Sequence, residues 1–177
     1  MGDTYRDLEQ YIALTSAGRA AFEAAHPYPF LTRLPQALPS TPNPWDDEFS
    51  FNTHVPGVET HVDEDEDRPS HAVIVQAVRK RPNGAFPMRI GIGRTRNSDV
   101  MLRFASVSKL HAQIHIDTTP WQLVDLDSAN GTYVNGVRLK ARQLHPIAIG
   151  DTLRIGTVDV TLISAGALYD QLRALRR

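Results

Sequence analysis

Two Asn-Gly dipeptides, placed five residues apart, constrain the fold of this chain more than any other feature. They are Asn130-Gly131 and Asn135-Gly136. Because asparagine and glycine both tolerate positive φ angles, each dipeptide predicts a tight reversal between β-strands. The residues between them favour a very short strand. Close turns of this kind are typical of a β-sandwich that presents its loops at one end.

From His71 onward, short apolar segments alternate with turn signals. This pattern predicts an all-β fold, an antiparallel β-sandwich over residues 71–164, followed by a short C-terminal helix over residues 165–177. Besides the short strand between the two dipeptides, the expected strands are residues 72–79, 86–92, 100–102, 111–116, 121–126, 152–155 and 158–163.

The first 70 residues have a different character. Residues 1–25 predict an N-terminal helical segment, which Gly18 weakens in the middle and Pro27 ends. Residues 26–70, the N-terminal arm, predict a Pro-rich and acidic linker. Its prolines disfavour helix and sheet, and the acidic run from Glu59 to Asp67 repels itself and is expected to be solvated.

The net charge of −1 hides a division between the two halves of the chain. Up to Ser70 there are four basic and thirteen acidic residues, a charge of −9, whereas from His71 there are fifteen basic and seven acidic residues, a charge of +8. A basic module tethered to an acidic segment is expected to prefer anionic ligands. The nearest anionic candidate is its own N-terminal arm.

Composition narrows the class of protein. The chain has no cysteine, which excludes disulfides and thiolate metal sites and fits a reducing compartment. It has no apolar run long enough to span a membrane, and its start lacks the pattern of a signal peptide. We therefore expect a cytoplasmic protein with no membrane partner.

Three polar motifs occur at expected strand ends. Gly93-Arg94 follows a strand, Ser108-Lys109-Leu110-His111 precedes the next one, and Ser128-Ala129-Asn130-Gly131-Thr132 contains the first dipeptide turn. With Val134-Asn135-Gly136, they resemble the forkhead-associated (FHA) domain, a phosphothreonine-binding module of bacterial and other proteins. The resemblance covers about residues 73–164 and leaves the first 70 residues unexplained.

The resemblance implies a set of site residues. Arg94, Ser108 and Lys109 would hold the phosphate, and Asn130 the backbone of the bound peptide. The residues that would support the site are Gly93, His111, Gly131, Thr132 and Asn135. The side-chain chemistry agrees, because an arginine fork and a hydroxyl suit a doubly charged group with three acceptor oxygens. Ala129 stands where some members have a threonine that helps bind the ligand, so one contact is missing.

Other sites are less well supported. His111 and His115 share a strand face but lack the further ligands of a zinc site, so no metal or cofactor is expected. Asp125 and Asp127 are a candidate pair of catalytic carboxylates, but we interpret Asp127 instead as the cap of its own turn. Arg79-Lys80-Arg81 is short and lacks interleaved aromatic residues, so we interpret it as a solubilising hairpin tip and not as a nucleic-acid site.

The sequence therefore predicts a signalling or scaffold module that binds phosphothreonine peptides downstream of a Ser/Thr kinase and is not an enzyme. The alternative is a structural interaction protein that docks a partner without phosphate. Thr60, followed three residues later by Asp63, is a candidate phosphosite through which the N-terminal arm would bind its own module. An incidental threonine in a solubilising linker is the alternative for Thr60.

Overall fold

A computed structural model describes residues 3–34, 73–82 and 86–175, with side chains from Leu8 onward. The acidic run and Thr60 lie outside the described residues. Among those that are described, no helix combines the length and the apolar character that crossing a bilayer would require.

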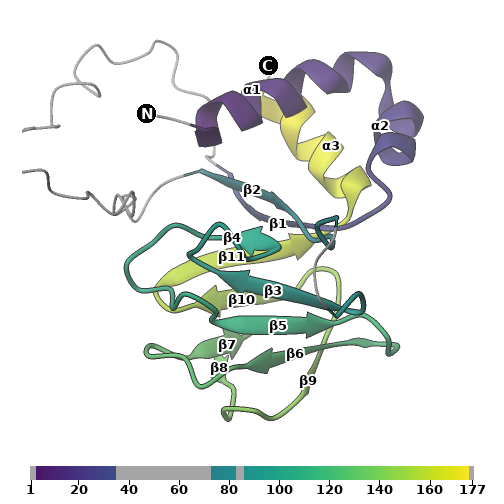
Figure 1. Ribbon diagram of the computed structural model, residues 1–177. Helices are drawn as coiled ribbons and strands as arrows, with labels where there is room; N and C mark the ends of the chain where they lie inside the picture. Colours follow the sequence, from purple (N-terminus) through teal and green to yellow (C-terminus); the bar gives the residue numbers. More distant parts are fainter. Residues whose placement is uncertain (1–2, 35–72, 83–85, 176–177) are drawn as a thin grey trace, which may run out of the picture.

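The strands form two sheets that face one another, and the predicted all-β sandwich is confirmed (Figure 1). One sheet has the order β2-β1-β11-β10-β7-β8 and the other β4-β3-β5-β6-β9. All pairs are antiparallel except β3 with β4. The bounds are β1 Phe30–Arg33, β2 Ile74–Ala77, β3 Arg89–Gly93, β4 Val100–Met101, β5 Ala112–His115, β6 Trp121–Asp125, β7 Thr132–Val134, β8 Val137–Arg138, β9 His145–Ile147, β10 Thr152–Ile155 and β11 Val158–Ile163.

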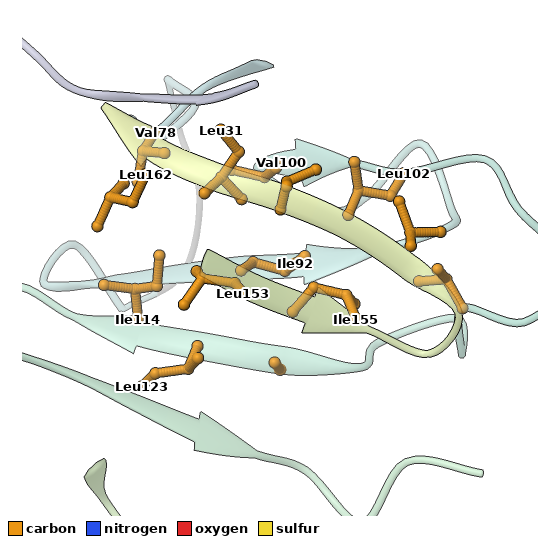
Figure 2. Close-up of a cluster of buried hydrophobic side chains, with 14 of the residues drawn as sticks. Leu31, Val78, Ile92, Val100, Leu102, Ile114, Leu123, Leu153, Ile155 and Leu162 are labelled. Atoms are coloured by element: carbon orange, nitrogen blue, oxygen red, sulfur yellow. The ribbon is translucent and has the colours of Figure 1, made fainter. Parts of the chain in front are cut away.

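The core lies between the two sheets and follows from alternation along the strands. In β10, Leu153 and Ile155 are buried, whereas the residues between and before them are exposed. Figure 2 shows these side chains meeting Ile92, Ile114 and Leu123 of the other sheet. This interlayer contact buries each of the five side chains almost completely, so it supplies a large part of the hydrophobic stabilisation.

Helices cover part of the outer face of the six-stranded sheet (Figure 1). They are α1 Asp3–Leu14, the 3₁₀ turn η1 Thr15–Ala17, α2 Arg19–Ala25 and α3 Ala165–Leu175. A second hydrophobic cluster joins Leu8 and Phe22 to Leu168 and to Phe30 and Val75 of the sheet. The helical segments at the two ends of the chain thus form one layer on the sandwich, as an amphipathic helix requires a surface to be stable. Arg19 adds an exposed ion pair to Asp170 of α3, at 3.0 Å.

The structure differs from the predicted linker at its start. Residues Phe30–Arg33 form β1, which lies between β2 and β11 inside the six-stranded sheet. Leu31 points into the sandwich core and Phe30 into the helical cluster, and both are 0% exposed. The prolines flank these four residues and do not interrupt them, so the density of proline around the segment concealed a strand.

We predict that Phe30→Ala lowers the free energy of unfolding by about 3–5 kcal/mol, because it leaves a cavity between the sheet and the helical layer. Urea denaturation measures this. Leu14→Ala is the matched control, since Leu14 is 42% exposed and should cost far less. Equal costs for the two variants would show that β1 is not an integral strand.

Candidate functional site

Three loops of the sandwich meet beside one another. The first follows β3 (residues 94–99), the second precedes β5 (residues 105–110), and the third follows β6 (residues 126–131). The Arg94 amide donates to the Ser108 carbonyl at 3.1 Å, and the Ala129 amide donates to the Ser108 hydroxyl at 3.2 Å. Ser108 therefore links the first loop to the third.

Gly93 allows the first two loops to approach closely. A Cβ atom at this position would lie 2.2 Å from the Lys109 carbonyl oxygen and 2.7 Å from the Ser98 hydroxyl. Only glycine leaves room for this contact. The Lys109 carbonyl in turn accepts the Thr95 hydroxyl at 3.1 Å, which fixes the course of the loop that carries Arg94.

His111 is completely buried and bridges the second and third loops. The Ser108 amide donates to His111 Nδ1 at 3.0 Å, so this nitrogen carries no proton. His111 Nε2 therefore carries the proton and donates to the Gly131 carbonyl at 3.1 Å. Burial lowers the pKa of His111, against the opposing effects of the Gly131 carbonyl and of Asp125. The bridge thus depends on the neutral ring.

Asp125, at the end of β6, organises the third loop. Its carboxylate accepts the Ser128 amide at 3.0 Å, the Ser128 hydroxyl at 2.6 Å and the Thr132 hydroxyl at 2.5 Å. Burial would raise the pKa of Asp125, but the hydrogen bonds from Ser128 and Thr132 outweigh it and lower the pKa. Asp127 was expected to cap this turn, but among the described residues the hydrogen bonds of the turn go to Asp125, and Asp127 takes a positive φ of 65°.

Asn130 is exposed, and a hydrogen bond to the second loop fixes its side chain. Its Nδ2 group donates to the Ser106 carbonyl at 2.8 Å, which directs the amide oxygen elsewhere. The neighbouring Gly131 carbonyl accepts the Gly156 amide at 3.0 Å, and the Thr157 hydroxyl and the Ser106 hydroxyl lie 2.8 Å apart. The β10–β11 turn thus completes the support of the third loop.

The structure brings most of the sequence-predicted site residues together. Arg94 and Ser108 are half-buried, whereas Lys109 and Asn130 are exposed, and Gly93, His111, Gly131 and Thr132 lie behind them. Asn135 is not part of this group, because it lies at the opposite end of β7. There it donates to Asp151 at 2.8 Å and accepts the Thr152 amide at 2.9 Å.

Sequence reasoning missed three residues that hold or border the site: Ser106, Asp125 and Arg138. The Arg138 guanidinium lies against Gly131, where a Cβ atom would be 2.8 Å from Nε. Ser106 is 24 residues from Asn130, so no local pattern reveals it. Asp125 did have a local signal, because its partners Ser128 and Thr132 follow it by three and seven residues and Asp and Ser are common turn formers.

The site has the character of an anion-binding surface. Arg94 and Lys109 supply positive charge. The Ser108 hydroxyl accepts a hydrogen bond from the Ala129 amide, and no described residue accepts the hydroxyl's own proton. Within the described ranges, no three His, Asp or Glu side chains come together as metal ligands would.

Comparison with known proteins finds similar sequences and structures. Residues 90–156 match the sequence model of the FHA domain. The glycogen accumulation regulator GarA of Mycolicibacterium smegmatis is 32% identical over 105 residues, which cover 56% of this chain and 64% of the relative. The oxoglutarate dehydrogenase inhibitor of Corynebacterium glutamicum is 33% identical over 75 residues, which cover 42% and 50% of the two chains.

One similar solved structure is that of Mycobacterium tuberculosis EmbR in complex with a low-affinity phosphopeptide. It is 31% identical, has a TM-score of 0.40, and the match covers 44% of this chain and 20% of that chain. Among the curated relatives, the matched part ranges from 24% to 64% of the relative's own length.

We predict that His111→Asn destabilises the protein more at pH 7.5 than at pH 5.5. The folded state keeps His111 neutral, because its pKa is lowered, whereas the unfolded state gains a proton below about pH 6.5. The stability that the neutral ring contributes is therefore present above that pH and is lost as the pH falls, by at most about 1.4 kcal/mol per pH unit.

The measurement is urea denaturation of both proteins at the two pH values. Asp125 does not contribute across this range, since its lowered pKa keeps it ionised in both states well above pH 4. A cost of substitution that is the same at both pH values would contradict the neutral bridge.

Proposed function

The chain is an FHA-domain protein of the bacterial type, and from this we propose that it binds phosphothreonine peptides as a signalling or scaffold module downstream of a Ser/Thr kinase. It acts by binding and carries out no reaction of its own. Its partner is a phosphorylated protein, and it needs no cofactor, nucleic acid or membrane.

One observation carries the proposal most directly: the hydrogen bonds at Ser108 hold Arg94 and the third loop at one place. A guanidinium group and a hydroxyl donor at the same surface suit a phosphate, because both make charge-assisted hydrogen bonds with its oxygens. Lys109 adds a second cation at the exposed rim.

Asn130 would hold the peptide backbone. Because the Ser106 carbonyl accepts one Nδ2 proton, the amide oxygen remains to accept a peptide N–H and the second Nδ2 proton remains to donate to a peptide carbonyl. The buried His111 and Asp125 would act indirectly, by holding the loops in place before the ligand arrives. A site prepared in this way avoids the cost of ordering loops on binding.

The names of two relatives support a binding role. One is called a regulator and the other an inhibitor of an enzyme, and neither name describes catalysis. The rival function, docking of a partner without phosphate, would not require both Arg94 and Ser108. These two residues therefore discriminate between the proposals.

The N-terminal arm is a further candidate ligand. Arg33 of β1 pairs with Ile74 of β2, so residues 34–73 form a loop whose two ends are neighbours in the sheet. From Ile74 back to Thr60, the chain reaches about 45 Å when extended, at roughly 3.3 Å per residue. A phosphorylated Thr60 could therefore reach the site, and its effective concentration would be in the millimolar range.

We predict that Arg94→Ala weakens the binding of a phosphothreonine peptide at least a hundredfold, because two charge-assisted hydrogen bonds are worth roughly 3 kcal/mol or more. Arg94→Lys should weaken binding nearly as much, since lysine keeps the charge and loses the planar fork. Isothermal titration calorimetry measures both. Arg173→Ala, on α3, is the control and should bind as the unaltered protein does.

Unchanged affinity in Arg94→Ala, together with equal binding of phosphorylated and unphosphorylated peptides, would favour the rival function.

We predict that phosphorylation by a Ser/Thr kinase weakens the binding of an added phosphothreonine peptide at least tenfold in the unaltered protein, but not in Thr60→Ala. The reason is that a tethered ligand competes at a high effective concentration. Before phosphorylation, the two proteins should bind equally. Equal affinities after phosphorylation would leave the N-terminal arm as a linker.

A further inference from the structure

A second concave surface lies between the helical layer and the edge of the six-stranded sheet. This cleft has a volume of about 360 Å³. One wall is formed by α1 and the segment after α2, including Tyr11 and Tyr28, and the other by β2 and the residues that follow it. Figure 1 shows β2 directly beneath α1. We refer to it as the β2-edge cleft.

The floor of the β2-edge cleft is a free strand edge. β2 is the terminal strand of its sheet, and Val75, Gln76 and Ala77 line the cleft. The Val78 amide donates toward β1, to Pro29, so by the alternation of an antiparallel ladder Gln76 also faces β1. Val75 and Ala77 therefore turn their backbone N–H and C=O groups outward, and no described residue bonds them there.

One end of the β2-edge cleft is positively charged. Arg79 and Arg81 line it and are exposed, and the Arg79 guanidinium lies 5.2 Å from the centre of the Tyr28 ring. The carboxylate that also lines the cleft, Asp99, is already paired with Lys80 at 2.8 Å. It also accepts the Arg81 amide at 3.0 Å, so the charge that the cleft presents at this end is that of the two arginines.

The segment Arg79-Lys80-Arg81 is therefore more than the solubilising tip that its sequence suggests. The Arg81 guanidinium donates to the Arg96 carbonyl, within the loop that carries Arg94. Lys80 and the Arg81 amide hold Asp99, at the end of the same loop. The basic segment is thus fastened in a defined position beside the candidate phosphate site.

We propose that the β2-edge cleft binds an extended peptide segment of a partner protein, which adds to β2 as a further strand and places acidic side chains against Arg79 and Arg81. The outward N–H and C=O groups of the partly exposed Ala77 supply main-chain bonds of strand addition, whereas Val75, at 3% exposed, lies under the helical layer. The two arginines select carboxylates at one end, and the apolar Ala77 favours a β-branched residue beside it.

The chain's own acidic run fits this site poorly. If residues 68–72 turned and the run folded back along β2, Asp63 to Asp67 would lie against Val73 to Ala77. The carboxylates of Asp63 to Asp67 would then face the apolar part of the edge, and Glu59 alone would stand opposite one of the two arginines, Arg81. They would also stand on both faces of the added strand, where the helical layer offers an apolar surface.

A partner that carries both a phosphothreonine and such a segment would bind at two neighbouring places; this extension alone rests on the proposed function. Occupation of one site raises the effective concentration at the other, so the combined affinity exceeds either one. Residues of the partner that lie away from its phosphothreonine would then help to select it.

The test uses the full chain and an unphosphorylated, fluorescein-labelled peptide of alternating valine and threonine that ends in two aspartates. A matched peptide carries asparagines in place of the aspartates. Each peptide is made in two versions, with these two residues at the N-terminus or at the C-terminus. We expect fluorescence anisotropy to show about tenfold tighter binding of the aspartate peptide in one orientation, an advantage that falls as salt is added.

Two variants locate the binding. Arg79→Glu should abolish the advantage of the aspartate peptide. Ala77→Pro should weaken both peptides at least tenfold, because it removes an outward N–H that the fold does not use, and proline is tolerated at such edge positions. Arg173→Glu is the charge-matched control, and Arg94→Ala should leave this binding unchanged. Thermal unfolding checks that each variant is folded.

The proposal is overturned if the aspartate peptide fails to bind, or if it binds Arg79→Glu as tightly as the unaltered chain. It is also overturned if replacing the acids of Glu59 to Asp67 by their amides increases peptide affinity strongly, since the chain's own run would then be the occupant. Because the peptide has no phosphate, failure here is distinct from failure of phosphothreonine binding, which Arg94→Ala tests.

Discussion

The neutral imidazole of His111 is the interaction on which the arrangement of the site depends. It accepts a hydrogen bond from the Ser108 amide and donates one to the Gly131 carbonyl, and it does so in a fully buried position. A protonated ring would lose its acceptor and carry a charge where solvent cannot reach, at a large cost. A side chain that offers only a donor or only an acceptor could not make both bonds. The positions of Ser108 and Asn130 relative to Arg94 thus follow from a group that is expected to touch no ligand.

The buried polar groups around His111 form a connected network in which each takes part in at least one hydrogen bond. The Asp125 carboxylate accepts hydrogen bonds from the Ser128 and Thr132 hydroxyls. The Gly131 carbonyl accepts one from His111 Nε2 and one from the Gly156 amide, and the Ser106 carbonyl accepts one from Asn130 Nδ2. Such networks stabilise loops when their groups are satisfied and destabilise them when one partner is lost. The same loops therefore need little support from apolar contacts, and their outer surfaces remain open to a charged ligand. This explains how exposed residues such as Lys109 and Asn130 can sit on a well-defined framework.

Much of the sandwich could be predicted from local sequence, because its strands carry their own signals. β10 and β11 begin and end where alternation and the Gly156 turn place them, and the helical segments near both ends of the chain were also expected. β1 was missed because the neighbouring prolines dominate its local composition, β8 because it is short and exposed, and β9 because it has only three residues. At the site, Arg94, Ser108 and Asn130 were found through motif resemblance. Ser106 was not found, since its contact with Asn130 joins residues 24 positions apart. The role of Asp125 was missed although its partners Ser128 and Thr132 lie within seven residues of it.

The position of β1 changes what the charge division of the chain means. With Phe30–Arg33 inside the sheet, the acidic run belongs to a closed loop between paired strands and not to a tail with one free end. Closing a loop of this length costs only a few kcal/mol of chain entropy, and the cost grows slowly with length. Both ends of the loop meet at the Arg33–Ile74 pair, which is at the opposite end of β2 from Arg79 and Arg81.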